Sequence, residues 1–90
     1  MLTSKKAAAL RYIQEEDDAP KMVAKGKGFI AEKIIEVAKE YNIPIHEDAN
    51  LVHVLEKMDL NTEIPEELYK AVAEILAMVY RLNAAQESNL

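Results

Sequence analysis

The segment from Pro20 to Gly28 constrains the fold of this chain more than any other stretch. Proline lacks a backbone N–H and favours an extended residue before it, whereas glycine adopts backbone angles that other residues avoid. The apolar residues from Met22 to Ala24 therefore predict a short strand that ends at the two glycines. Apolar residues recur at helical spacing from Phe29 onwards, so this strand leads directly into a helix.

Two amphipathic helices and one extended segment are predicted in the middle of the chain. The first helix covers residues 29–41, because apolar and charged side chains fall on opposite faces. Residues 43–46, Ile-Pro-Ile-His, predict a short strand at a sheet edge, where the missing N–H of proline needs no partner. Either Asp48 or Asn50 can cap the second helix, which begins with Leu51 and Val52.

The strongest helical pattern lies near the end of the chain. Pro65 suits the first turn of a helix, and Glu66 and Glu67 complement the positive end of its dipole. The apolar stripe that follows at helical spacing consists of Leu68, Ala71, Val72, Ile75, Leu76, Val79 and Leu82. The pattern is lost at residue 84, so residues 84–90 are expected to form a disordered tail.

Residues 7–12 are compatible with two structures. The sequence Lys-Lys-Ala-Ala-Ala-Leu-Arg behind Ser4 has a high helix propensity, and serine is a suitable N-cap. The alternative is a strand with Ala8, Leu10 and Tyr12 on one face, because tertiary contacts often override propensity. The local sequence leaves both structures open.

Strands and helices alternate along the chain, which predicts a domain of the α/β class. We expect a small mixed sheet of about three to four short strands covered by about three helices. The chain has 90 residues and no internal repeat or linker, so residues 1–83 are expected to form a single domain. Its core is expected to be aliphatic, because the sequence holds one Phe, four Tyr and no Trp.

Charge and composition limit the classes of protein to which this sequence can belong. Sixteen acidic and eleven basic residues give a net charge of −5, so we expect no nucleic-acid partner. The sequence has no cysteine, which excludes disulfides and thiolate chemistry and fits a reducing compartment. Nowhere do about 18 apolar residues follow one another, so no membrane span is expected.

No arrangement of residues predicts an enzyme. The loop around Gly26 and Gly28 lacks the Ser or Thr that a G-x-x-x-x-G-K-[ST] phosphate loop places beside magnesium. The residues with clustered metal-binding side chains are His46, Glu47, Asp48 and His53. Their spacing does not place them on one face of a strand or helix. We therefore expect no catalytic residue, no cofactor and no metal site.

Three blocks of sequence carry a resemblance to known proteins. The blocks are Pro20-Lys21-Met22-Val23-Ala24-Lys25-Gly26-Lys27-Gly28, Asn42-Ile43-Pro44 and Ile64-Pro65-Glu66-Glu67-Leu68-Tyr69-Lys70-Ala71-Val72-Ala73-Glu74. In this order and spacing they resemble the cytoplasmic C-terminal domain of the FlhB/YscU family, the substrate-specificity switch of flagellar and type III secretion export machines. The resemblance covers residues 7–82, implies a small α/β fold, and favours a strand over a helix at residues 7–12.

One motif of that family is missing from this sequence. Family members carry Asn-Pro-Thr-His just before the strand that matches residues 7–12, and their asparagine attacks its own carbonyl to break the Asn-Pro bond. The matching positions here are Leu2, Thr3, Ser4 and Lys5, and the sequence contains no Asn-Pro dipeptide. Self-cleavage is therefore not expected. The membrane spans that precede the domain in the family are missing as well, so we expect a free-standing domain.

The resemblance also implies a binding surface. In the family, substrate recognition is associated with an apolar patch where the turn before the Pro-x-x-Val-Ala-Lys-Gly segment approaches the last helix. The matching positions are Ala19, Pro20, Ala73 and Leu76, whose small apolar side chains would leave a shallow groove for an apolar peptide. The alternative is that Ala73 and Leu76 face the core, as residues at helical spacing commonly do.

Lys21, Lys25 and Lys27 form a second candidate surface. They lie around the glycines just before a helix N-terminus, where free amides and the helix dipole favour anions. They can be ordinary solvated side chains or contacts to an acidic partner surface. The resemblance favours the contact with a partner.

The resemblance implies an FlhB-like component of protein export that acts by contact. Its expected partners are proteins: export-apparatus components, exported rod- and hook-type subunits, and a truncated FlhB-like membrane protein that this chain completes in trans. The expected location is the cytoplasm, including the periphery of the export gate at the inner membrane, and a monomer is compatible with the sequence. The alternative is an unrelated dimerisation or adaptor module that uses the apolar stripe of the last helix.

Overall fold

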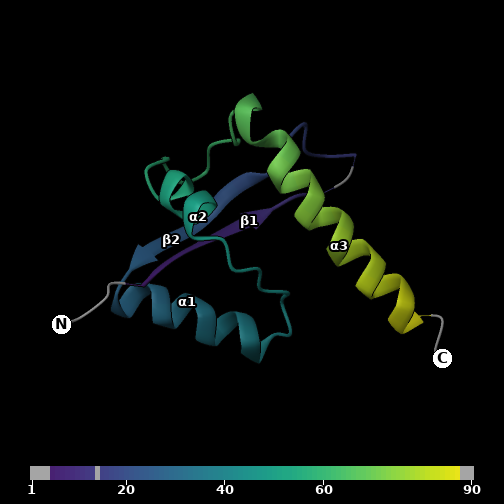
Figure 1. Ribbon diagram of the computed structural model, residues 1–90, viewed down its shortest axis with the longest axis horizontal. Coiled ribbons are helices and arrows are strands. Elements are labelled where there is room, and N and C mark those ends of the chain that lie inside the picture. Colours follow the sequence, from purple (N-terminus) through teal and green to yellow (C-terminus); the bar gives the residue numbers. More distant parts are fainter. Residues whose placement is uncertain (1–4, 14, 88–90) are drawn as a thin grey trace.

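The computed structural model describes residues 5–13 and 15–87 of the chain. Two strands come first, β1 (Lys6–Arg11) and β2 (Lys21–Lys27), and α1 (Phe29–Glu40) begins directly after the glycine that follows β2. The later elements are α2 (Ala49–Leu55), the 3-10 helix η1 (Glu66–Leu68) and α3 (Tyr69–Glu87). Figure 1 shows the two strands side by side, with α1 next to one end of the pair and the start of α3 at the other end.

The first strand confirms the extended structure at residues 7–12. β1 pairs with β2 in antiparallel register, with Lys6 opposite Lys27 and Arg11 opposite Lys21. The register shifts by a bulge between Ala9 and Leu10. The helix propensity of this segment is therefore overridden by its hydrogen bonds to β2.

The α/β class and the three helices are confirmed, but the sheet is smaller than expected. Within residues 5–13 and 15–87 it has two strands, both antiparallel, rather than a mixed set of three to four. Residues 43–46 are fully on the surface and form no strand. Pro44 has no N–H to offer a ladder, and the segment forms part of the connection between α1 and α2.

The connection before α3 forms some of the hydrogen bonds to β2 that a third strand would form. The Met22 N–H donates to the Thr62 carbonyl at 3.0 Å, and the Ile64 N–H donates to the Pro20 carbonyl at 2.9 Å. Only one bridge, between Lys21 and Glu63, has sheet geometry. This connection therefore fixes the start of β2 to the residues that lead into α3.

The main core lies on the face of the sheet that α2 and α3 cover, and it is built from aliphatic and methionine side chains. Its buried residues are Met22, Leu51, Leu55, Ile64 and Val72. Ala8 and Leu10 of β1 pack against them, which places these two residues on one face as expected. The side chain of Met22 is completely buried at the centre of this core.

Small residues on the opposite face let α1 approach the sheet closely. Ala7 and Gly26 are cross-strand partners. A Cβ atom added to Gly26 would lie 2.6 Å from the Cβ of Ile30 in the first turn of α1. Ala31, in the same turn, is fully buried. A glycine at position 26 is therefore required by packing rather than by backbone angle.

The helix ends show which capping predictions hold. The Leu51 N–H donates to Asp48 Oδ1 at 3.0 Å, so Asp48, and not Asn50, caps α2. Pro65 lies just before η1, and α3 begins after that turn, at Tyr69. α3 continues to Glu87, so residues 84–87 are helical although a disordered tail is expected from residue 84 onwards. Alanine, glutamine and glutamate have high helix propensity, which favours continuation of the helix.

Candidate functional site

A groove of about 320 Å³ lies between α3 and the connection from β1 to β2. Its lining is mostly apolar or aromatic and consists of Tyr12, Asp18, Ala19, Pro20, Ile64, Tyr69, Val72, Ala73, Leu76, Ala77 and Tyr80. The turn just before β2 forms one wall, and one face of α3 forms the other. The position of this turn is fixed by the hydrogen bond from Ile64 to Pro20.

All four positions that the sequence proposed for an apolar patch line this groove. Ala19 is 2% exposed and Pro20 is also buried, so they form a rigid part of the lining. Ala73 is exposed in the groove, whereas Leu76 is half-buried and also packs against the main core. The core-facing alternative therefore applies to Leu76 in part and not to Ala73.

Sequence reasoning missed the tyrosines of this groove. Tyr69 and Tyr80 are 44% and 47% exposed, and with Tyr12 they give the groove three aromatic rings that end in hydroxyl groups. The helical spacing of Tyr69, Ala73, Ala77 and Tyr80 could have identified this face of α3, because residues three and four apart share a face. Tyr12 could not be placed without knowing that the chain turns back after β1.

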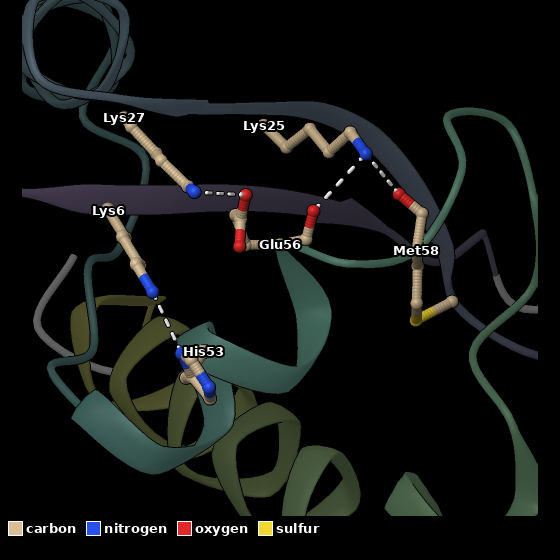
Figure 2. A network of polar contacts seen from close by, with 6 residues as sticks. All are labelled: Lys6, Lys25, Lys27, His53, Glu56 and Met58. Carbon is tan, nitrogen blue, oxygen red and sulfur yellow. Dashed lines mark hydrogen bonds and ion pairs between the residues drawn. The ribbon is translucent and has the colours of Figure 1, made fainter.

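The three predicted lysines do not line the groove. Lys21 lies at the start of β2, where it is half-buried beside Glu63. Lys25 and Lys27 lie at the other end of β2, next to the end of α2, as Figure 2 shows. The candidate lysine surface is therefore divided between the two ends of the sheet.

Lys25 has structural contacts that no sequence motif indicated. Its Nζ donates to the carbonyl oxygens of Glu56 at 3.2 Å and Met58 at 2.5 Å (Figure 2). These carbonyls follow the last turn of α2, where intrahelical donors are lacking. Lys25 therefore caps the C-terminal end of α2.

Glu56 is the acidic centre of a basic cluster. Its Oε1 lies 3.3 Å from the Nζ of Lys27. Burial raises the pKa of the Glu56 carboxyl, but the hydrogen bond and charge of Lys27 and the charges of Lys6 and Lys25 together lower it below its ordinary value. Nearby, the Nζ of Lys6 lies 2.8 Å from Nδ1 of His53 (Figure 2). These contacts join both strands to α2.

Metal sites and membrane spans are both absent from the described part of the chain. Among residues 5–13 and 15–87, no three His, Asp or Glu side chains are grouped so that they could hold a metal ion. None of the helices in the same ranges is both long enough and apolar enough to span a membrane.

The fold and the groove together define a class: a small α/β domain with a shallow apolar groove beside its last helix. The chain belongs to the FlhB HrpN YscU SpaS family, whose sequence profile matches residues 4–79. This is a family of flagellar and type III protein export. The expected resemblance to FlhB and YscU is thereby confirmed.

The relatives differ in the fraction of their length that aligns with this chain. YlqH of Bacillus subtilis is 43% identical over 79 residues, which cover 88% of this chain and 85% of YlqH. The flagellar biosynthetic protein FlhB of Aquifex aeolicus is 49% identical over 74 residues, which cover 81% of this chain but 21% of FlhB. The crystal structure of the cytoplasmic domain of FlhB from Shewanella putrefaciens has a TM-score of 0.83 and 38% identity, over 92% of this chain and 69% of that domain.

Proposed function

We propose that this chain serves protein export by contact, and that its groove binds a short apolar segment of an exported or apparatus protein. The observation that carries this proposal is the convergence of Ala19, Pro20, Ala73 and Leu76 on one groove. An open, largely apolar trough with a few polar groups suits a peptide better than a small metabolite. Family membership makes export-apparatus proteins and rod- or hook-type subunits the expected partners.

In this proposal the chain is not an enzyme and does not cleave itself. The chemistry of self-cleavage in the family needs an Asn-Pro bond, and the sequence has none. The chain would act in the cytoplasm, at the periphery of the export gate, and would replace the C-terminal domain of FlhB in trans.

Complementation tests the proposal. The chain is expressed in a motile bacterium whose FlhB is truncated just after its membrane region, and secreted hook and filament proteins are quantified. We expect the wild-type chain to restore secretion and Ala73→Asp to abolish most of the rescue, because a carboxylate in the groove opposes binding of an apolar segment.

Ala49→Asp is the matched control for this experiment. Ala49 is exposed in the first turn of α2, outside the groove, and aspartate is well tolerated at that end of a helix. Circular dichroism verifies that both variants are folded. Absence of rescue by the folded wild-type chain, or equal rescue by Ala73→Asp and Ala49→Asp, would contradict the proposed function.

A further inference from the structure

Acidic side chains follow one another in the connection at one end of the sheet. Lys6, Lys25 and Lys27 lie where β1 begins and β2 ends. The connection at the other end of the sheet, which leads to the groove, carries Glu15, Glu16, Asp17 and Asp18. In Figure 1 this connection passes the first half of α3. The groove therefore lies beside an acidic connection, whose flanking strand ends carry Arg11 and Lys21.

Two adjacent aspartates in this connection have different surroundings. Asp17 has a side chain that is 6% exposed; its carboxylate accepts the Ile13 N–H at 2.8 Å and lies 3.6 Å from Arg11. Asp18 is exposed and lines the groove. Among the side chains that the structure describes, those of residues 5–13 and 15–81, no hydrogen bond or ion pair engages its carboxylate. Asp17 thus holds the turn, whereas Asp18 can face a ligand.

The tyrosines of the groove add a second preference for positive charge. Tyr12, Tyr69 and Tyr80, whose side chains are aromatic rings, line the same groove as Asp18. An ammonium or guanidinium group over such a ring is attracted by its quadrupole. Arg11, which precedes Tyr12, is already paired with Asp17, and Lys21 follows Asp18 by three residues at the start of β2.

We propose that the groove selects apolar peptide segments that carry Lys or Arg beside their apolar residues, with Asp18 as the partner of the basic group. This inference rests on the proposed function and adds a charge requirement to it. The apolar residues fill the trough between the turn and α3, while the basic group reaches the carboxylate at its edge. A segment with Asp or Glu at the same place is repelled by Asp18 and the acidic residues before it.

A random peptide library on phage tests this inference on many candidate segments at once. It is selected against the full chain and, separately, against Ala73→Trp, in which a bulky uncharged side chain fills the groove. Peptides that bind the wild type and not Ala73→Trp depend on the groove. We expect these peptides to be enriched in Lys and Arg, and depleted in Asp and Glu, next to their apolar residues.

Substitutions that change the charge of Asp18 test whether this residue causes the preference for basic peptides. Asp18→Asn should weaken binding of a selected basic peptide about two- to fivefold in fluorescence polarisation, the range for an exposed ion pair. Asp18→Lys should remove the basic enrichment from a repeated selection. Glu40→Lys is the matched control, because Glu40 is exposed at the end of α1 and does not line the groove. At about 1 M salt the difference between wild type and Asp18→Asn should disappear.

The outcomes separate this inference from the proposed function. Groove-dependent peptides without any charge preference, or a preference that survives in Asp18→Lys, would overturn the inference and leave apolar binding intact. A selection that yields no groove-dependent peptide would overturn both. Basic enrichment that Asp18→Lys removes and Glu40→Lys retains would support both.

Discussion

Lys25 connects the end of α2 to the sheet through a single ammonium group. Its two acceptors are backbone carbonyls of Glu56 and Met58, and its side chain is partly buried. A cation at the C-terminal end of a helix is favourable because it complements the helix dipole. A variant that reverses this charge would therefore damage the fold before it could report on a partner.

We expect Lys25→Met to lower the free energy of unfolding by about 1.5–3 kcal/mol, the range for hydrogen bonds to a charged group. Methionine keeps the apolar stem and removes the ammonium group, so the carbonyls lose their donor. Lys27→Met is the matched control, because its surface ion pair with Glu56 contributes about 0–1 kcal/mol. Urea titrations measure both changes, and equal losses would contradict the capping role of Lys25.

The sequence predicts the positions of the groove residues better than it predicts the contacts of Lys25. Ala19, Pro20, Ala73 and Leu76 could be located, because motif blocks fix their order along the chain and the fold brings the blocks together. The environment of Lys25 could not be predicted, because its acceptors are backbone atoms more than thirty residues away. Backbone carbonyls exist at every position, so no side-chain pattern marks them.

At the scale of elements, α2 is held to the sheet by apolar contacts on one side and by charges at its end. Leu51 and Leu55 are buried in the main core. Glu56, just after the helix, lies beside Lys27 of β2. The polar part of this attachment depends on the ionisation of one carboxyl group.

Glu56 predicts a loss of stability in acid. Its pKa in the folded chain is lowered below the ordinary value of a glutamate, so its carboxylate stabilises the fold fully above that ordinary value. This stabilisation is lost as the pH falls from there through the lowered pKa of the folded state. The wild type should therefore lose more of its free energy of unfolding than Glu56→Gln between about pH 6 and about pH 3.

Urea titrations at the two pH values provide this comparison. Glutamine has nearly the same size and keeps a hydrogen-bond acceptor, so the two proteins differ mainly in the titration of one group. A parallel decrease in both proteins would show that another carboxyl group controls stability in acid.

β1 and residues 43–46 show that a local sequence pattern does not by itself predict whether a segment forms a strand. Three alanines in β1 favour a helix in isolation, but Ala7 lies opposite Gly26, where small residues let α1 approach the sheet. Residues 43–46 have the composition of an edge strand but are exposed without a neighbouring strand. A strand forms only where another segment supplies hydrogen-bonding partners, and that is decided by the fold.

At the scale of the whole molecule, one buried side chain joins the sheet to both helices of its covered face. Met22 belongs to β2 and lies in one cluster with residues of α2, α3 and the connection before α3. The molecule is elongated, 46 × 28 × 19 Å. This cluster is the main apolar contact that joins β2, α2 and α3. Its integrity also fixes the groove, because Ile64 and Val72 belong to both.

We expect Met22→Ala to lower the free energy of unfolding by about 2–5 kcal/mol, as large-to-small changes in packed cores do. The loss combines the removed apolar area with the cavity that remains. Met78→Ala is the matched control, because the same change at a side chain that is 43% exposed should stay within about 0.5 kcal/mol. Thermal unfolding monitored by circular dichroism tests both variants, and similar midpoints would contradict a single core centred on Met22.

The sequence by itself determined the α/β class, the helices, the aliphatic core and the family. These properties depend on the periodicity of apolar residues, on the positions of proline and glycine, and on the order of the motifs. All three can be read from the sequence without knowledge of contacts between distant segments. Tertiary structure alone decided that the sheet keeps two strands in its described part and that Asp18 and three tyrosines share the groove, and its contacts override the helix propensity of β1. Each of these depends on contacts between distant segments, whose free energy exceeds the small conformational preferences that a local sequence encodes.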